Sequence, residues 1–371
     1  MNAINLEPEI WTAEVVYTGF GTPMLDGGLV VVGEHVAAIG GLEELRQTYP
    51  SANIIHRGKA LTPPVVNAHT HLDLSKLSLY RGSYTGFIKQ VIAGGAERGI
   101  DAARMGLNEL EVLRVGAFGD IVARDEVMDF LLEHSPLPGV LYREVLGSNP
   151  DQADEIFNSV KPKFLAWKRR EGRAKVGISP HTAHTVSAPL MKKLVEFAGL
   201  EDFPVQIHIA ESPEETSYFR DNSGPLAEFM APFNPSWRGP GISPVEYLAD
   251  LGLLGPHITL VHGVQVDEND VQIIAQAGCK LISCPRSNEG LECGIFPWSL
   301  YGKHNVEVAL GTDSSGSSPD LDVRKEALFL WDKGIDPRVL VRAATRSGYR
   351  ALGLEAVRIT RGTPISQVQS W

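Results

Sequence analysis

The stretch Val65-Val66-Asn67-Ala68-His69-Thr70-His71-Leu72 decides how the rest of the chain can be interpreted. The segment before it, residues 60–66, is apolar enough to form a buried strand. If the strand continues, His69 and His71 point to the same side, because side chains alternate along an extended segment. Two imidazoles at the end of a core strand can hold one metal ion. The alternative is that two polar residues simply end a strand.

Further histidine and acidic side chains stand near the ends of later apolar runs. They are His181, His208 with Glu211, His262 and Asp313. In each case the apolar segment comes first and the polar group second. This order is expected if all of them converge on the C-terminal rim of a parallel barrel.

From residue 61 onward, β-type runs alternate with helical stretches, which is typical of repeated βα units. The runs predict eight strands at about 61–67, 116–122, 139–145, 176–181, 205–211, 258–262, 280–284 and 306–313. Eight such strands that close on themselves form a (β/α)8 TIM-like barrel, and so we expect an α/β fold. The competing fold is a doubly wound open sheet, but no Gly-x-Gly-x-x-Gly follows the first strand.

The two ends of the chain are expected to form a second, smaller unit. Residues 1–60 contain short β-type runs without helical periodicity, including a hairpin around Gly33-Glu34. We expect 1–60, completed by 356–371, to form a small β-sandwich subdomain, and 61–355 to form the barrel. The segment 212–245 contains six prolines, and we expect it to be a long irregular loop that acts as a substrate lid or wall.

Composition excludes several classes of protein. The formal net charge of −11 argues against nucleic-acid or acidic-membrane partners, which require a basic face. No apolar run approaches the roughly 18 residues that a membrane helix needs, and the start of the chain lacks the features of a secretory signal. The three cysteines lack Cys-x-x-Cys spacing, which favours reduced thiols. We therefore expect a cytoplasmic protein that acts on a small molecule, with a homodimer left open.

The strand-end side chains together predict a metal-dependent hydrolytic site. Three imidazoles and one carboxylate, from His69, His71, His208 and Asp313, suit zinc first and iron(II) as the alternative, and they leave one position open for water. A bound metal lowers the pKa of that water and makes hydroxide available. Glu211, three residues after a ligand, is placed to move a proton to the leaving group. His262 is a candidate for orienting the hydroxide or polarising the bond under attack.

Six short motifs, in this order, resemble those of the amidohydrolase superfamily. They are Asn67-Ala68-His69-Thr70-His71-Leu72, Ser179-Pro180-His181-Thr182, His208-Ile209-Ala210-Glu211-Ser212, Val261-His262-Gly263, Ser283-Cys284-Pro285-Arg286-Ser287-Asn288 and Leu310-Gly311-Thr312-Asp313-Ser314. The similarity is to the mononuclear branch of aromatic deaminases and chlorohydrolases. The binuclear branch needs a carboxylated lysine at the end of strand 4, and residues 177–181 contain no lysine.

The resemblance implies roles for individual residues. It implies that the four ligands named above bind one divalent metal, and that Glu211 protonates a ring nitrogen of the base. It further implies that Asp313 takes a proton from the metal-bound water and that His262 steadies that water. His181 matches a family position that touches the nucleoside or heterocycle.

Within this branch, the chain is most similar to the aminodeoxyfutalosine deaminases of menaquinone biosynthesis. The similarity rests on His-Leu-Asp-Leu-Ser at 71–75, Cys-Pro-Arg-Ser-Asn at 284–288 and the short C-terminus. The implied substrate is an adenine nucleoside with a benzoate-bearing tail, and by charge we expect Arg286 to bind the carboxylate. Asn288, in the same stretch, is a further expected substrate contact.

Several alternatives stay open at the level of the sequence. Glu144 contacts substrate hydroxyls or only pairs with Arg143, and His184 is a ligand contact or a surface residue. Residues 179–184 replace the usual Pro-His-Ala/Gly-Pro-Tyr pattern. The alternative substrates are S-adenosylhomocysteine, adenosine, guanine, cytosine and chlorinated triazines, because pocket contacts rather than the metal decide specificity. A remote alternative is a catalytically silent relative that binds a ligand.

Overall fold

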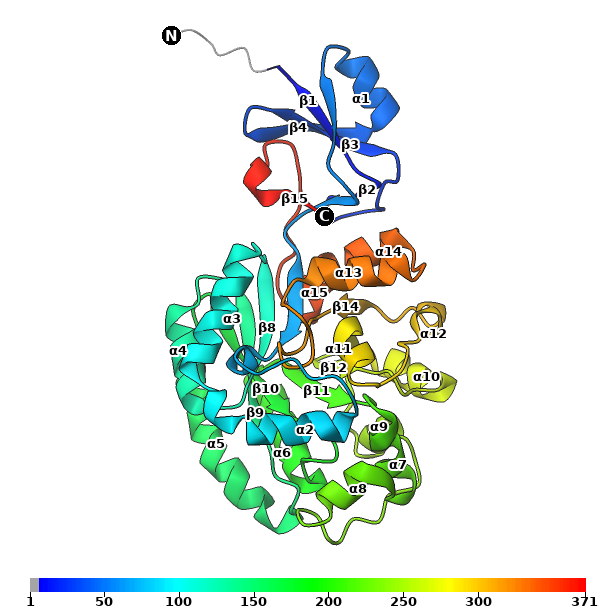
Figure 1. The fold of residues 1–371 in the computed structure, drawn as a ribbon. Coiled ribbons are helices and arrows are strands. Elements are labelled where there is room, and N and C mark those ends of the chain that lie inside the picture. Colours follow the sequence, from blue (N-terminus) through cyan, green and yellow to red (C-terminus); the bar gives the residue numbers. More distant parts are fainter. Residues whose placement is uncertain (1–6) are drawn as a thin grey trace.

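The computed structural model describes residues 7–371, and its centre is an eight-stranded parallel sheet (Figure 1). The strands are β7 (Val66–Thr70), β8 (Ala117–Val122), β9 (Gly139–Val145), β10 (Ala174–Pro180), β11 (Val205–Ile209), β12 (Ile258–His262), β13 (Lys280–Ser283) and β14 (Val308–Leu310). They are hydrogen-bonded in chain order from β7 to β14. The predicted α/β barrel is therefore confirmed.

The barrel is closed by a short irregular seam between β14 and β7. Thr70 and Asp313 form an isolated parallel bridge. The main-chain N–H groups of Thr312 and Asp313 both donate to the carbonyl of His69, at 3.1 and 3.0 Å. The side-chain amide of Asn67 donates to the hydroxyl of Thr312 at 2.7 Å and accepts from the main-chain N–H of Thr312 at 3.1 Å. The seam therefore lies among the expected metal ligands.

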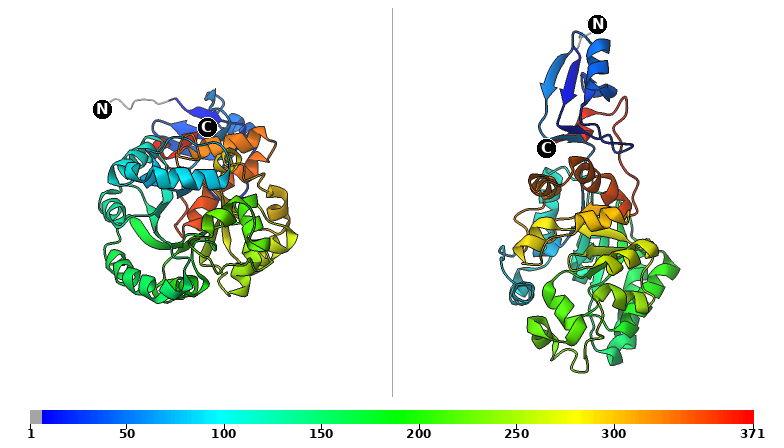
Figure 2. Two further views of the ribbon diagram at one scale, coloured as in Figure 1. Left: turned by 60° about the horizontal axis from the view of Figure 1, so that its bottom comes forward. Right: turned by 90° about the vertical axis from the view of Figure 1, so that its right-hand side faces the viewer.

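Helices surround the barrel strands (Figure 2). They are α2 (Tyr84–Ala93), α3 (Ile100–Val112), α4 (Asp125–His134), α5 (Ala153–Lys168), α6 (Ala188–Glu201), α7 (Pro213–Asp221), α8 (Gly224–Met230), α9 (Pro244–Asp250), α10 (Glu268–Ala277), α11 (Pro285–Gly290), α12 (Trp298–Lys303), α13 (Val323–Asp332), α14 (Pro337–Ala343) and α15 (Arg346–Ala351). The apolar side of α3, with Leu107 and Leu110 buried, packs into the main core. None of the helices within residues 7–371 is long and apolar enough to cross a membrane.

Two small sheets form a separate unit above the barrel (Figures 1 and 2). The first has the order β4 (His35–Gly41), β3 (Gly27–Val32), β1 (Glu9–Thr12), β5 (Asn53–His56), with α1 (Leu42–Thr48) beside it. The second has the order β15 (Gln369–Ser370), β6 (Ala60–Thr62), β2 (Val15–Val16). Because β15 pairs antiparallel with β6, C-terminal residues complete the small unit, as the expected fold required.

The predicted strand over 61–67 is in fact two strands. Pro63 and Pro64 separate β6, which belongs to the small unit, from β7, which belongs to the barrel. Proline has no N–H to donate and restricts the residue before it, so it ends a ladder in the interior of a sheet. As a result His69 lies inside β7 and His71 directly after it.

The prediction of a long irregular loop over 212–245 was wrong for much of its length. Helices α7 and α8 lie within this segment and α9 begins at its end. Their prolines occupy the first helical turn, where the missing N–H has no intrahelical partner to lose. These residues therefore start helices instead of breaking them.

Candidate active site

A cavity of about 570 Å³ opens at the C-terminal end of the barrel strands. Five of the expected metal-binding and catalytic residues line it, and they come from the ends of β7, β11, β12 and β14: His71, His208, Glu211, His262 and Asp313. This end of the barrel also carries α8 and lies away from the small β unit (Figure 1). The structure thus brings together side chains that are more than 240 residues apart in the sequence.

The expected metal ligands lie close enough to bind one ion. One ring nitrogen of each of His69, His71 and His208 lies within 4.8 Å of the others. Asp313 Oδ1 is 3.8 Å from His69 Nε2 and 3.3 Å from His71 Nε2. All four residues are buried. Three imidazoles and a carboxylate are a donor set that zinc and iron(II) both accept.

Two hydrogen bonds fix which nitrogen of these histidines is free. His208 Nδ1 lies 3.0 Å from the main-chain oxygen of His181, which can only accept, so Nδ1 carries the proton. Gln206 Nε2 donates to the Ala68 carbonyl at 3.0 Å, which leaves Gln206 Oε1 to accept from His69 Nδ1 at 3.0 Å. In both rings Nε2 is therefore the unprotonated nitrogen, and it faces the site.

The buried imidazoles are suited to bind a cation in their neutral form. Burial lowers the pKa of His69 to about 4 and the pKa values of His71 and His208 well below their usual range. Among residues 7–371, His69 Nε2 has no hydrogen-bond partner although it is buried. A buried lone pair without a donor is unfavourable unless a ligand satisfies it, and one divalent cation held by these residues would do so.

Asp313 is held with one oxygen toward the histidines. Its Oδ2 accepts from the hydroxyls of Ser287 at 2.7 Å and Ser317 at 2.9 Å. Burial by itself would raise the pKa of Asp313, but the imidazoles of His71, His262 and His69, with the Ser287 hydroxyl, lower it below its usual value. The carboxylate form is therefore favoured, with Oδ1 free to act as a ligand.

Two site residues, and the residue just before Glu211, adopt left-handed backbone conformations at the ends of their strands. The φ angles are +48° at Ala210, +74° at His262 and +61° at Asp313. Such angles are uncommon for residues other than glycine, and they persist where surrounding contacts hold them in place. They turn the chain sharply at the rim, so that Glu211, His262 and Asp313 line the same cavity.

Glu211 and His262 lie beside the proposed ligands. Glu211 Oε2 is 3.6 Å from His262 Nε2, and His262 Nδ1 is bonded to Asn288 Oδ1 at 2.9 Å. Burial raises the pKa of the Glu211 carboxyl well above its usual range, and the carboxylates of Asp313 and Glu215 raise it further. Glu211 is therefore a buried carboxyl whose surroundings favour its protonated form.

The expected substrate contacts on β9 and after β10 also face the cavity. Glu144 and His181 line it, with His181 Nε2 3.7 Å from Glu144 Oε1. Glu144 does not pair with Arg143 through its carboxylate, because Arg143 binds Asp125 at 2.8 Å. The surface alternative for His184 was wrong, since His184 is only 2% exposed and lines the cavity.

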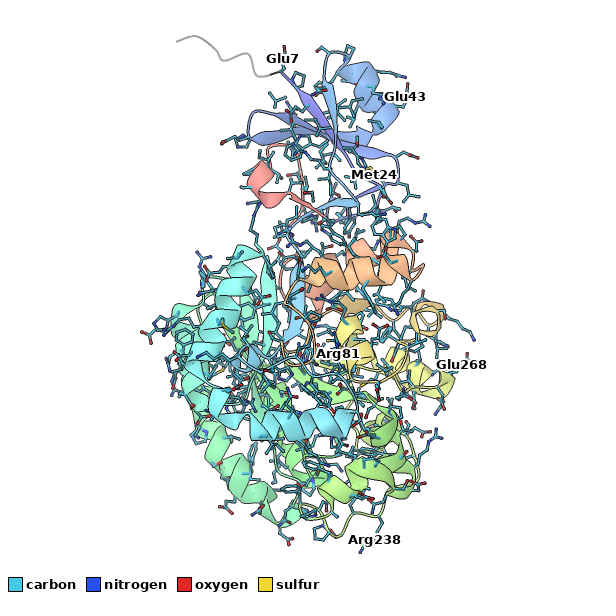
Figure 3. The ribbon with its side chains drawn as sticks, in the orientation of Figure 1. Glu7, Met24, Glu43, Arg81, Arg238 and Glu268 are labelled. Atoms are coloured by element: carbon cyan, nitrogen blue, oxygen red, sulfur yellow. The ribbon has the colours of Figure 1, made fainter. Side chains whose placement is uncertain are left out.

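Arg286 lies outside the residues that line the cavity. It is the second residue of α11, and its guanidinium binds Glu326 at 2.6 Å and Asp320 at 2.9 Å. Arg81, whose side chain Figure 3 shows beside α11, donates a hydrogen bond to the main-chain oxygen of Arg286. A guanidinium already paired with two carboxylates has little left to offer a substrate carboxylate. Asn288, two residues later, likewise does not line the cavity and instead binds His262.

Sequence reasoning missed Arg98 and the apolar wall of the cavity. Arg98 lines the cavity and pairs with the buried Asp73 at 2.8 Å. The wall is formed by apolar side chains from α2 and from α8 with the residues that follow it: Phe87, Ile88, Val91, Ile92, Phe229, Met230 and Phe233. Arg98 belongs to no motif. The apolar side of α2 is readable as a helical stripe, but the sequence does not show that it faces a ligand.

Comparisons with known proteins agree with this geometry. Residues 60–364 match the amidohydrolase family. The aminodeoxyfutalosine deaminase of Deinococcus radiodurans is 44% identical, over 97% of this chain and 89% of that protein. A 5-methylthioadenosine/S-adenosylhomocysteine deaminase of Nitratidesulfovibrio vulgaris is 27% identical, over 92% of this chain and 78% of that protein. The structure of Helicobacter pylori aminofutalosine deaminase with methylthio-coformycin is similar in fold, with a TM-score of 0.76 at 24% identity over 96% of this chain and 90% of that chain.

Proposed function

This chain belongs to the amidohydrolase family, and on that premise we propose that it deaminates an aminated purine nucleoside by metal-dependent hydrolysis, with aminodeoxyfutalosine of menaquinone biosynthesis as its substrate. The observation that carries the proposal is that the four candidate ligands lie together beside Glu211 and His262 at one cavity, which all of these residues except the fully buried His69 line. The 44% identity to an aminodeoxyfutalosine deaminase supports this choice of substrate.

The proposed metal site consists of His69, His71, His208 and Asp313, with zinc as the first candidate and iron(II) as the alternative. When bound, the cation lowers the pKa of a water molecule toward neutrality and thereby supplies the nucleophile. Gln206 and the His181 carbonyl keep two of the imidazoles oriented. These supporting hydrogen bonds hold the ligands in place before an ion arrives.

The remaining site residues move and direct protons. Glu211 holds a proton in its buried carboxyl and gives it to a ring nitrogen of the base, so that the amine-bearing carbon accepts the nucleophile. His262 keeps its Nδ1 proton on Asn288 and faces the reacting centre with Nε2, which orients the attacking water. Asp313 takes a proton from the attacking water and passes it to the amino group, which leaves as ammonia, and the remaining hydroxyl proton returns to Glu211 as the carbonyl forms. The overall reaction consumes water and replaces the amino group by a carbonyl oxygen.

The rest of the cavity suits a nucleoside with a bulky apolar substituent. Glu144 and His181 are the proposed contacts for the nucleoside, because they lie beside the candidate metal ligands. The apolar wall from α2 and α8 offers a surface for an aromatic tail. Arg98, and not Arg286, is the arginine that lines the cavity. A cytoplasmic location is part of the proposal and is supported by three free, buried cysteines.

The test is ammonia release from a substrate panel, with metal content measured on the same preparation. The panel contains aminodeoxyfutalosine, adenosine, S-adenosylhomocysteine, 5-methylthioadenosine, guanine and cytosine. We expect aminodeoxyfutalosine to have the highest kcat/KM. Preferred turnover of S-adenosylhomocysteine or 5-methylthioadenosine would support the activity named for the Nitratidesulfovibrio relative and refute our choice of substrate. If a metal-loaded preparation released ammonia from no member of the panel, the proposed deaminase activity would be refuted.

A further inference from the structure

Two helices of this protein begin with the same sequence pattern but use its glutamate differently. The pattern Ser-Pro-x-Glu occurs at residues 212–215, which open α7, and at 243–246, which open α9. In both, the serine hydroxyl accepts from the N–H of the glutamate. Glu246 then accepts from the N–H of its own serine at 2.8 Å, which completes a capping box. Glu215 reaches one residue further back and accepts from the N–H of Glu211 at 2.7 Å.

The surroundings of the two glutamates also differ. Glu246 is partly exposed, and its second oxygen accepts from Asn269 at 3.0 Å. Glu215 is 1% exposed, and within residues 7–371 its second oxygen has no hydrogen-bond partner. A buried carboxylate oxygen without a partner is unfavourable, and capping alone does not require it, as Glu246 demonstrates. Glu215 therefore does more than begin a helix.

The unpartnered oxygen of Glu215 faces a second unsatisfied group. His184 Nδ1 lies 3.8 Å from Glu215 Oε1, and His184 is itself buried, with the rings of Tyr84 and Tyr218 beside it. In the described part of the chain neither ring nitrogen of His184 has a hydrogen-bond partner. A proton on Nδ1, toward the carboxylate, is the favourable arrangement. It leaves Nε2 as a free acceptor on a residue that lines the cavity.

Glu215 also completes the support of a strained turn. Ala210, with φ at +48°, directly precedes Glu211. The carbonyl of Ala210 accepts from the N–H groups of Val264 and Gln265, at 2.9 and 2.8 Å. The N–H on the other side of the turn, that of Glu211, is held by Glu215. The direction of the Glu211 side chain therefore depends on a charge-assisted hydrogen bond to a residue outside the six motifs quoted from this sequence.

We infer that Glu215 and His184 form a positioning pair that connects substrate binding to the placement of Glu211. Glu215 fixes the main chain of Glu211, and His184 accepts a hydrogen bond from an N–H or O–H of the bound nucleoside. The pair joins the segment after β10 to the segment after β11, on which the proton-transferring residue stands. The inference rests on the proposed function, because it assigns Glu211 its role in proton transfer.

The test compares Glu215→Ala, Glu215→Gln and Glu246→Ala, with Glu246→Ala as the matched control for loss of a cap. We expect Glu215→Ala to lower kcat about 30-fold, within the range that general acids contribute, with KM and metal content little changed. Glu215→Gln keeps an oxygen for the Glu211 N–H and should restore most of kcat, and Glu246→Ala should keep the normal kcat. Equal kcat for Glu215→Ala and Glu246→Ala would overturn the inference, and so would a Gln variant as slow as the Ala variant.

Two further measurements complete the design. His184→Phe should raise KM about tenfold, since the site then lacks a hydrogen-bond partner for a substrate group, and an unchanged KM would overturn the substrate contact. Amide exchange at Glu211 needs no turnover. It should be faster in Glu215→Ala than in the wild type, Glu215→Gln and Glu246→Ala, and equal rates would overturn the positioning role. A wild-type enzyme that deaminates nothing on the panel refutes the proposed function, while the exchange result still decides this inference.

Discussion

Glu211 is the side chain on which the proposed proton transfer depends. Burial holds its pKa well above the usual range, so it can keep a proton until the ring nitrogen takes it. Glu211→Gln preserves the shape of the side chain but cannot donate that proton. We expect kcat for ammonia release to fall by about 10²- to 10⁴-fold, with metal content unchanged. Near-normal turnover of a metal-loaded Gln variant would show that another group protonates the base.

His262 depends in turn on Asn288, a residue that the sequence suggested as a substrate contact. Asn288 accepts from His262 Nδ1 at 2.9 Å and is almost fully buried. Asn288→Ala removes this acceptor and lets the imidazole turn, so we expect kcat to fall by up to about a hundredfold while KM changes little. Asn269→Ala, at an exposed asparagine, is the control. A large rise in KM with normal kcat would instead support the original idea of direct substrate contact.

The residues of the site could be predicted to different degrees for a physical reason. His69, His71, His208 and Asp313 follow apolar runs, and the carboxyl ends of barrel strands meet at one rim, so their convergence was predictable. The direction of the Arg286 side chain was not predictable, because Arg286 lies in α11 and binds two carboxylates that are 34 and 40 residues further along the chain. The roles of all these residues in catalysis remain predictions.

At the scale of elements, proline shows why boundaries were harder to predict than strands and helices. Pro63 and Pro64 split one expected strand into two that belong to different sheets. Pro213 and Pro244 do the opposite and begin helices within a segment expected to be loop. Proline removes an N–H donor from the ladder of a sheet. In the first turn of a helix that N–H has no intrahelical partner, so its absence does not destabilise the helix. Serine immediately before Pro213 and Pro244 was the available signal, because it is a favoured N-cap residue.

The wall formed by α2 and the residues after α8 should act on the substrate tail alone. Phe233 lines the cavity but is 55% exposed, so truncating it should cost little stability. We expect Phe233→Ala to lower kcat/KM for aminodeoxyfutalosine about tenfold, as loss of an aromatic contact does, and to leave kcat/KM for adenosine unchanged. Leu200→Ala, on the exposed surface of α6, is the control. Equal losses for both substrates would place the tail elsewhere.

At the scale of the whole molecule, the candidate metal site lies where the barrel closes. Neighbouring barrel strands are joined by ladders, whereas β14 and β7 meet through one isolated bridge, two main-chain hydrogen bonds to His69 and the side chain of Asn67. His69 and His71 lie on the β7 side of this seam and Asp313 lies on the β14 side, while His208 belongs to β11. A ligand set that spans the seam connects the first and last strands of the barrel. The site should therefore contribute to folding stability as well as to chemistry.

Metal removal should accordingly destabilise the whole barrel. A cation present at about a hundredfold above its Kd stabilises the folded state by about 2.7 kcal/mol, and for a chain of 371 residues we expect chelation to lower Tm by roughly 3–5 °C. The loss should be reversed by added zinc. Asp313→Ala removes one ligand from the seam, and its Tm should respond much less to chelator than that of the wild type. If chelation strips the metal and the wild-type Tm does not move, the metal contributes only to chemistry and the seam is stable by its own hydrogen bonds.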